Sequence, residues 1–359
     1  MTTNKMKLRQ ICLFVITFSL VTKIIILPSI IAGYSKESLW ISALINFIID
    51  GAMIFFILKI GDNFKGLSFF QILKENIGGV PTKIIFFFYF LYFLLKAYSP
   101  IMEQKSFIEI ALYETTHVVW IFSPIFLIST FFSYKGLKTV GRISDVLIWF
   151  TSFAFIILIS LSIPASNPSN LLPIIGIPFK NVLKGSWFSV LWHLDSTYLL
   201  FLIGSFKRER LSKTKIMVAY GIVTLAVLVF FAVLYSEFGP LTERQSFAPI
   251  KMGKYFLSVS NTGRIDYAAG FALAIVCVFA VSLPLVFATL CLSHAFNFPH
   301  KIIPCLITNG IMAILFLTTQ NYYFETFKIM QYYLIYFLIF MAYVVPFILL
   351  FCKKGRRAV

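Results

Sequence analysis

The chain has 359 residues, of which 59% are hydrophobic, 18% aromatic and only 13% charged. Soluble domains are about 45–50% apolar and about 25% charged, so this composition excludes an ordinary soluble protein and predicts an all-α integral membrane protein in a lipid bilayer. The net charge of +17 does not indicate a nucleic-acid partner, because the basic residues lie mostly in short loops between apolar runs.

Ten apolar stretches are long enough to cross a bilayer, which requires about 20 residues per helix. They run approximately over 10–32, 38–59, 83–101, 118–134, 143–163, 186–206, 215–238, 266–291, 302–320 and 331–352. The short loops between them leave a single transmembrane domain over residues 1–359. If the N-terminus is cytoplasmic, roughly twice as many Lys and Arg lie on that side as on the other, which predicts that both termini are cytoplasmic.

The first stretch contains the segment FSLVTKIIILPSII, which carries Lys23 near the middle of the span and Pro28 five residues later. A charge at this depth costs about 2.5–3.5 kcal/mol, so Lys23 is expected to face the interior of the bundle. Pro28 removes one backbone hydrogen bond, which predicts a break around Thr22–Ile24, with a kinked but continuous helix as the alternative. The basic start resembles a signal peptide, but we expect no cleavage because Lys23 interrupts a long apolar run.

The second and third stretches also contain ionisable residues. Asp50 lies with Asn46 in the second, and Lys96 lies in the third, close to the outer interface. A carboxylate inside the membrane needs a partner or a watery cavity, so Asp50 is a candidate functional residue. Lys96 either extends to the interface along its flexible stem or faces the interior, and the sequence leaves both open.

The sixth stretch is the other unusually polar one, with His193 and Asp195 in its middle. Polar segments at the start of each half of a ten-helix chain are typical of inverted-repeat transporters, in which discontinuous helices 1 and 6 form a midplane site. We therefore expect an inverted five-helix repeat, with one half over approximately 10–163 and the other over approximately 186–352. Lys23 would then either pair with Asp195 or Asp50 or lie beside a cavity as a free cation.

Arg264 and Asp266 precede the eighth stretch. They form either a charged helix start or a pair that docks the preceding outer loop and gates the cavity. The five cysteines are scattered, with no C-x-x-C pair and no histidine at metal-ligand spacing, so neither a disulfide framework nor a metal site is expected. Zinc-protease and nucleophile-elbow motifs are also absent from the sequence, which argues against an enzyme and against a cofactor.

Three phrases resemble the B-subunit family of endospore germinant receptors, within the amino acid–polyamine–organocation transporter superfamily. They are IIILPSII at 24–31, NLLPIIGIPFKNVLKGSW at 170–187 and NTGRIDYAAGF at 261–271. The resemblance implies the LeuT-like fold and a small germinant, often an amino acid, bound between the unwound parts of helices 1 and 6. It also implies the spore inner membrane, or cell membrane, and partnership with A-type and C-type receptor subunits.

The resemblance places a ligand pocket at residues contributed by helices 1 and 6. Carried over by position, these are Val21, Thr22, Lys23, Ile24, Leu194, Asp195 and Ser196, with Pro28, Arg264 and Asp266 as gating or structural residues. Relatives commonly have glycines around Val21 and Lys23 and a Gly-Glu pair where this chain has Leu194 and Asp195. A lysine in place of glycine could bind a ligand carboxylate directly or pair with Asp195 in the empty state.

The sequence is therefore consistent with two functions. One is a germinant sensor that binds an amino acid within a receptor complex and changes shape. The other is an amino acid or cation-coupled secondary transporter, in which a buried lysine or aspartate titrates during alternating access. Both share one architecture, and a fold does not decide between them.

Overall fold

The computed structural model describes residues 5–64, 66–111, 118–173, 176–252 and 265–351. Apart from an isolated bridge between Met6 and Phe206, every regular element within these ranges is helical. The α-helices are α1 (Leu8–Ile24), α2 (Leu27–Ser35), α3 (Leu39–Asn63), α4 (Phe69–Ile77), α5 (Gly79–Ala111), α6 (Val118–Lys135), α7 (Leu137–Ser162), α8 (Phe179–Ser189), α9 (Ser196–Leu202), α10 (Ser212–Phe238), α11 (Ala248–Lys251), α13 (Ile265–Phe296), α14 (Ile302–Thr319), α15 (Tyr323–Ile329), α16 (Ile335–Ile339) and α17 (Val345–Leu349). The expected all-α class is confirmed.

Seven helical stretches of the described chain are long and apolar enough, by length and composition, to cross a membrane. They are Leu27–Asn63, Gly79–Ser106, Leu137–Ala165, Ser212–Arg244, Gly270–Phe296, Ile302–Thr319 and Tyr323–Leu349. Two of the predicted spans, 10–32 and 186–206, are interrupted as α1–α2 and α8–α9. The chain is thus an integral multi-pass membrane protein, while the count of ten spans, the repeat boundaries and the position of the termini stay predictions.

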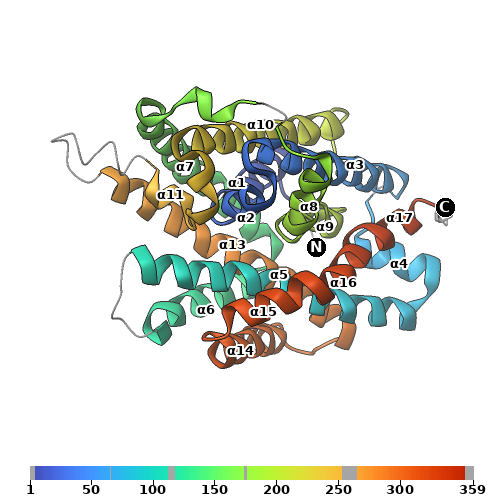
Figure 1. The fold of residues 1–359 in the computed structure, drawn as a ribbon. Helices are drawn as coiled ribbons and strands as arrows, with labels where there is room; N and C mark the ends of the chain where they lie inside the picture. Colours follow the sequence, from blue (N-terminus) through green and yellow to red (C-terminus); the bar gives the residue numbers. More distant parts are fainter. Residues whose placement is uncertain (1–4, 65, 112–117, 174–175, 253–264, 352–359) are drawn as a thin grey trace.

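The interrupted helices lie in the middle of the bundle. Helices α3, α7 and α10 lie along one side and α5, α6, α14 and α15 along the other, with α1, α2, α8 and α9 between them (Figure 1). Helix α1 packs against α10 and α7, and α8 packs against α2 and α3. Helix α13 packs against α5, α6 and α7 and so connects the two sides. Protein therefore surrounds the non-helical backbone, which could not be tolerated in contact with lipid.

Helix α4 is a short amphipathic helix that the pattern of apolar stretches does not predict. Ser68 and Gln71 start it with a capping box, in which the Gln71 side chain accepts from the Ser68 N–H at 2.8 Å. Phe69, Ile72 and Leu73 form its buried face. A helix of 9 residues is too short to cross the membrane, so α4 packs on the bundle as a surface element.

The segment before α1 is joined to the segment after α9. The N–H of Met6 donates to the carbonyl of Ser205 at 3.0 Å, and the N–H of Lys207 donates to the carbonyl of Met6 at 3.1 Å. These two bonds form the isolated bridge. They connect the ends of the two interrupted helices that lie furthest from the breaks.

Ion pairs secure the same end of the molecule. The Arg9 guanidinium lies 3.0 Å from the Asp145 carboxylate, and the Gln10 amide donates to the same carboxylate at 2.8 Å, which joins α1 to α7. Arg208 pairs with Asp62 at the end of α3. Burial lowers the pKa of the Arg208 guanidinium, and the Asp62 carboxylate acts in the opposite direction. Contacts from α3 and α7 thus close this end around α1 and α9.

Candidate functional site

The first break separates α1 from α2. Helix α1 ends at Ile24, and Ile25 and Ile26 are non-helical. Pro28 lies in the first turn of α2, where its missing N–H needs no partner. In a continuous helix Pro28 would lack the hydrogen bond to the carbonyl of Ile24, and its ring would clash with that carbonyl. The sequence centred the break on Thr22–Ile24, whereas the structure places it directly after these residues. The alternative of a continuous helix is not what the structure shows.

The second break separates α8 from α9. Helix α8 passes into a 3-10 turn, Val190–Trp192, and residues 193–195 follow before α9 begins. Leu194 has φ of 67° and is fully buried. This left-handed conformation costs an L-residue about 1–2 kcal/mol because its Cβ approaches the following carbonyl. Leu194 therefore adopts the conformation that favours glycine, at a position where the resemblance implies glycine in relatives.

Side chains from α5 bind the carbonyl groups of the second break. The Lys96 ammonium donates to the carbonyls of Leu191 at 2.9 Å and His193 at 2.7 Å. The Tyr92 hydroxyl donates to the carbonyl of Leu194 at 3.3 Å. Lys96 is only 7% exposed, so of its two expected orientations it takes the one that faces the interior.

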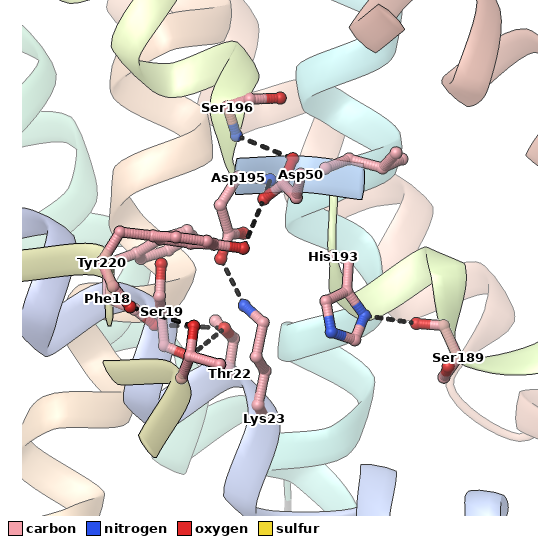
Figure 2. Close-up of polar contacts among 12 residues, drawn as sticks. Phe18, Ser19, Thr22, Lys23, Asp50, Ser189, His193, Asp195, Ser196 and Tyr220 are labelled. Carbon is pink, nitrogen blue, oxygen red and sulfur yellow. Dashed lines mark hydrogen bonds and ion pairs between the residues drawn. The ribbon is translucent and has the colours of Figure 1, made fainter. Parts of the chain in front are cut away.

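An aspartate from α3 satisfies the N–H groups of the same break. The Asp50 carboxylate, which is fully buried, accepts from the N–H of Asp195 at 3.1 Å and from the N–H of Ser196 at 3.3 Å (Figure 2). It also accepts from the Tyr220 hydroxyl of α10 at 3.3 Å. A carboxylate at the first N–H groups of a helix replaces the missing intrahelical acceptors. Asp50 thus has a structural partner, as expected for an ionisable group at this depth.

Asn46 and His193, two polar residues that the sequence places inside apolar stretches, bind the C-terminal end of α8. The Asn46 amide of α3 donates to the carbonyl of Ser186 and to the Ser189 hydroxyl, both at 2.7 Å. The His193 ring lies with Nδ1 3.0 Å from the carbonyl of Ser189 (Figure 2). Because a carbonyl can only accept, Nδ1 is the nitrogen that carries the proton. Both residues therefore position backbone at the second break.

Lys23 and Asp195 connect the two interrupted helices. The Lys23 ammonium, fully buried, forms an ion pair with the Asp195 carboxylate, which belongs to a residue 6% exposed (Figure 2). The ammonium also lies 5.7 Å from the centre of the Phe47 ring, within the range of a cation–π interaction. A buried charge requires such a partner. The partners expected for Lys23 were Asp195, Asp50 or a ligand carboxylate, and in the structure the ammonium pairs with Asp195.

A cavity of about 30 Å³ lies on another side of α1 from this ion pair. It is lined by Phe18, Val21, Thr22, Ile25, Lys96, Ser99, Pro100, Glu103, Gln104, Leu191, Trp192, Tyr198, Cys277 and Ala280. These residues come from α1, the first break, α5, the second break, α9 and α13. A volume of about 10–15 Å³ accommodates one water, so the cavity has room for only a few small atoms in the conformation seen.

The residues predicted for the pocket divide between these two places. Val21 and Thr22 line the cavity, whereas the side chains of Lys23 and Asp195 point toward each other. Ser196 contacts Asp50 through its backbone N–H. Ile24 and Leu194 are buried next to the two breaks and do not line the cavity. Arg264 lies outside the described residues, as does the side chain of Asp266, so the gating role expected of them stays a prediction.

Glu103 and Gln104 also line the cavity, and the sequence pattern indicated neither of them. The third apolar stretch was expected to end at residue 101, which placed Glu103 in a loop. Helix α5 instead continues through Pro100 to Ala111. The available signal was a Ser99, Glu103 spacing of one helical turn, and Ser99 does donate to Glu103 at 2.9 Å.

Comparison with known proteins identifies a family with this sequence pattern. The model of the family described as "Spore germination protein" matches residues 5–325. The spore germination protein YndE of Bacillus subtilis (strain 168) is 20% identical over 223 residues, which are 62% of this chain and 61% of YndE. The aligned part thus spans less than two thirds of this relative's length.

Solved structures of transporters share the arrangement of helices. A variant of the manganese transporter of Eremococcus coleocola aligns with a TM-score of 0.56 and 12% identity, over 95% of this chain and 77% of the transporter. Mhp1, a nucleobase-cation-symport-1 family transporter in a closed conformation with bromovinylhydantoin bound, aligns with a TM-score of 0.53 and 14% identity, over 88% of this chain and 74% of Mhp1. At these identities the likeness shows a LeuT-like transporter fold and nothing more specific.

Proposed function

Because the chain belongs to the spore germination protein family, we propose that it is the B-type membrane subunit of a germinant receptor. In this role it binds a small germinant, an amino acid, in the spore inner membrane and acts with A-type and C-type subunits to start germination. The site lies between the two interrupted helices and includes Val21, Thr22, Lys23, Ile24, Leu194, Asp195 and Ser196. The protein carries out no chemical reaction on the ligand.

The observation that carries the proposal is the ion pair between the two breaks. Lys23 lies just before the first break and Asp195 just after the strained Leu194 of the second. A ligand that binds next to this pair changes the charge balance of both helices together. Because Met6 also joins the start of α1 to the segment after α9, the two helices would move together. Such a movement can transmit ligand binding to the partner subunits.

A germination assay tests the receptor role. Spores that retain this receptor as their only one are exposed to single amino acids, and loss of refractility and of heat resistance is recorded. We expect a response to at least one amino acid, lost in a deletion strain and in Lys23→Met. Lys215→Gln removes a lysine from an exposed ion pair, 3.1 Å from Glu209, and should respond normally. An amino acid response that persists unchanged after deletion would contradict the proposal.

A secondary transporter is the second candidate, and the transporter structures that share the fold favour it. Uptake of radiolabelled amino acids into proteoliposomes separates the two functions. A sensor should bind without accumulating its ligand. Robust accumulation by the purified protein, lost in Lys23→Met and retained in Lys215→Gln, would replace the receptor proposal with amino acid transport.

A further inference from the structure

A basic groove lies at the closed end of the bundle, where the start of α1, the segment after α9 and the start of α10 meet. It has a volume of about 840 Å³, within the range of about 300–1,000 Å³ that is usual for small-molecule sites. The acid among its described lining residues is Glu209, and the basic ones are Lys5, Lys7, Arg9, Lys207 and Lys215. The basic groove shares no lining residue with the cavity beside α1.

Some of these charges are already neutralised. Arg9 lies 3.0 Å from the Asp145 carboxylate and Lys215 lies 3.1 Å from the Glu209 carboxylate, so neither cation is part of the site inferred below. The remaining lysines are exposed and have no ion-pair partner within the described ranges; they are Lys5, Lys7 and Lys207. The basic groove therefore keeps an excess of positive charge after its own acid has been paired.

The backbone holds two of these lysines next to each other. The isolated bridge pairs Met6 with Phe206 in the parallel direction, and both of these side chains are buried. Side chains alternate along extended backbone, so the residues that follow, Lys7 and Lys207, lie on the opposite, exposed side of the bridge. Like charges held side by side on paired segments are destabilising. An anion that binds both ammonium groups would remove this repulsion.

The basic groove lies where charged sequence gives way to apolar sequence. In α1 the first group of charges ends at Arg9, and in α10 the charges end at Lys215, each followed by a long uncharged run. Basic residues at such a boundary lie at the level of the lipid headgroups. From the groove, exposed apolar residues continue along one face of α10 at helical spacing; they are Val218, Ile222, Leu225 and Val229.

From these observations we infer that the basic groove binds one anionic phospholipid, whose phosphate lies between the Lys7 and Lys207 side chains. An acyl chain of this lipid lies along the exposed apolar face of α10. That face begins at the groove itself, which favours a lipid over a soluble anion or an acidic protein segment. The bound phosphate offsets the repulsion between the two lysines and so stabilises the isolated bridge. A receptor and a transporter could both use such a site.

Native mass spectrometry of the purified, delipidated full chain tests this site. Phosphatidylglycerol and phosphatidylcholine with the same acyl chains are titrated separately, so that only the headgroup charge differs. We expect the first phosphatidylglycerol to bind at least about tenfold more tightly than the first phosphatidylcholine. The variant Lys7→Gln with Lys207→Gln should lose most of this preference. Glycerophosphoglycerol, the same headgroup without acyl chains, should not displace phosphatidylglycerol at equal concentration, and displacement would overturn the lipid site in favour of a soluble anion.

Lys59→Gln with Lys74→Gln is the matched control. It removes two exposed lysines, from α3 and α4, that do not line the basic groove and have no ion pair within the described residues. This control should keep the wild-type preference. Equal affinity of the wild-type protein for the two lipids would overturn the inference, as would an equal loss of preference in both double variants, which would indicate a response to total charge alone. If Lys7→Gln with Lys207→Gln does not purify as a single species, each single variant is compared with Lys74→Gln by the same criteria.

Discussion

Lys23 is stabilised in the membrane interior by a full countercharge. The Asp195 carboxylate contacts its ammonium, and the Phe47 ring lies beside it. Removing one member of a buried pair leaves the other charge without compensation, at a cost of about 3–5 kcal/mol. Replacing both members by neutral groups avoids that cost. Lys23 and Asp195 should therefore behave as a coupled unit.

We predict that Lys23→Met and Asp195→Asn each markedly lower the melting temperature of the detergent-solubilised protein. The double variant should lose less than the sum of the two single losses, because it leaves no unpaired charge. The charge-reversed variant, Lys23→Asp with Asp195→Lys, should regain part of what each single change loses. Thermal unfolding followed by tryptophan fluorescence measures these effects, and strictly additive losses would argue against direct pairing.

Leu194 provides a second prediction at this scale. Leu194→Val places a β-branched side chain at a positive φ, where the crowding of Cβ is greatest. Leu200→Val removes the same methylene from another fully buried leucine, within the regular helix α9. We expect Leu194→Val to be about 1 kcal/mol more destabilising than Leu200→Val in the same unfolding assay. Equal losses would mean that the left-handed backbone at residue 194 carries no strain.

The sequence predicted single residues well where a charge was isolated in an apolar run. Lys23, Asp50 and Asp195 stood out for that reason, because a buried charge requires a partner. Glu103 did not stand out, since it follows Pro100 and a proline usually ends a helix. The sequence offered Asp195 and Asp50 as partners of Lys23 but did not decide between them, because that contact depends on the packing of helices distant in sequence.

Among the elements, the two breaks differ in how they are maintained. The first break follows from local sequence, since Pro28 prevents α1 from continuing. The second contains no proline and depends on neighbouring helices, with Lys96 bound to its carbonyls and Asp50 to its N–H groups. The first break was therefore predictable to within a few residues. The second was predictable only as a polar segment.

We predict that Asp50→Ala loosens the second break. The N–H groups of Asp195 and Ser196 lose their acceptor, and a buried N–H without a partner costs about 1–3 kcal/mol. Hydrogen exchange followed by mass spectrometry should show protection over residues 193–202 falling by roughly tenfold or more, with α14 unchanged. Asp50→Asn keeps one acceptor oxygen and should have a smaller effect. Unchanged exchange in Asp50→Ala would show that α9 begins without help from α3.

At the scale of the whole molecule, one end of the bundle is closed around α1. Arg9 and Gln10 bind Asp145, and Met6 is bonded on both sides to the segment after α9. The Arg9 side chain is 71% exposed, so its ion pair contributes at most about 1 kcal/mol. A closure of this strength is stable but can be reversed by the binding of a small ligand.

We predict that Asp145→Ala increases the accessibility of Cys12 on α1. Cys12 is partly buried, and Cys277, Cys291 and Cys305 are buried. In a background with Cys352→Ser, which removes a cysteine outside the described residues, maleimide labelling of Cys12 should accelerate by roughly fivefold at most. Lys105→Ala breaks a partly exposed ion pair on α5 and should leave the rate unchanged. Equal rates in wild type and Asp145→Ala would show that Asp145 does not hold α1 in place.

The bonds of Met6 give the first residues of the chain a further consequence. Any displacement of α9 has to pull Met6 with it or break two backbone hydrogen bonds. A movement of α9 in the interior of the membrane therefore changes the position of the short extended segment around Met6. A partner protein that binds this segment would respond to the conformation of α9 without contacting α9 itself.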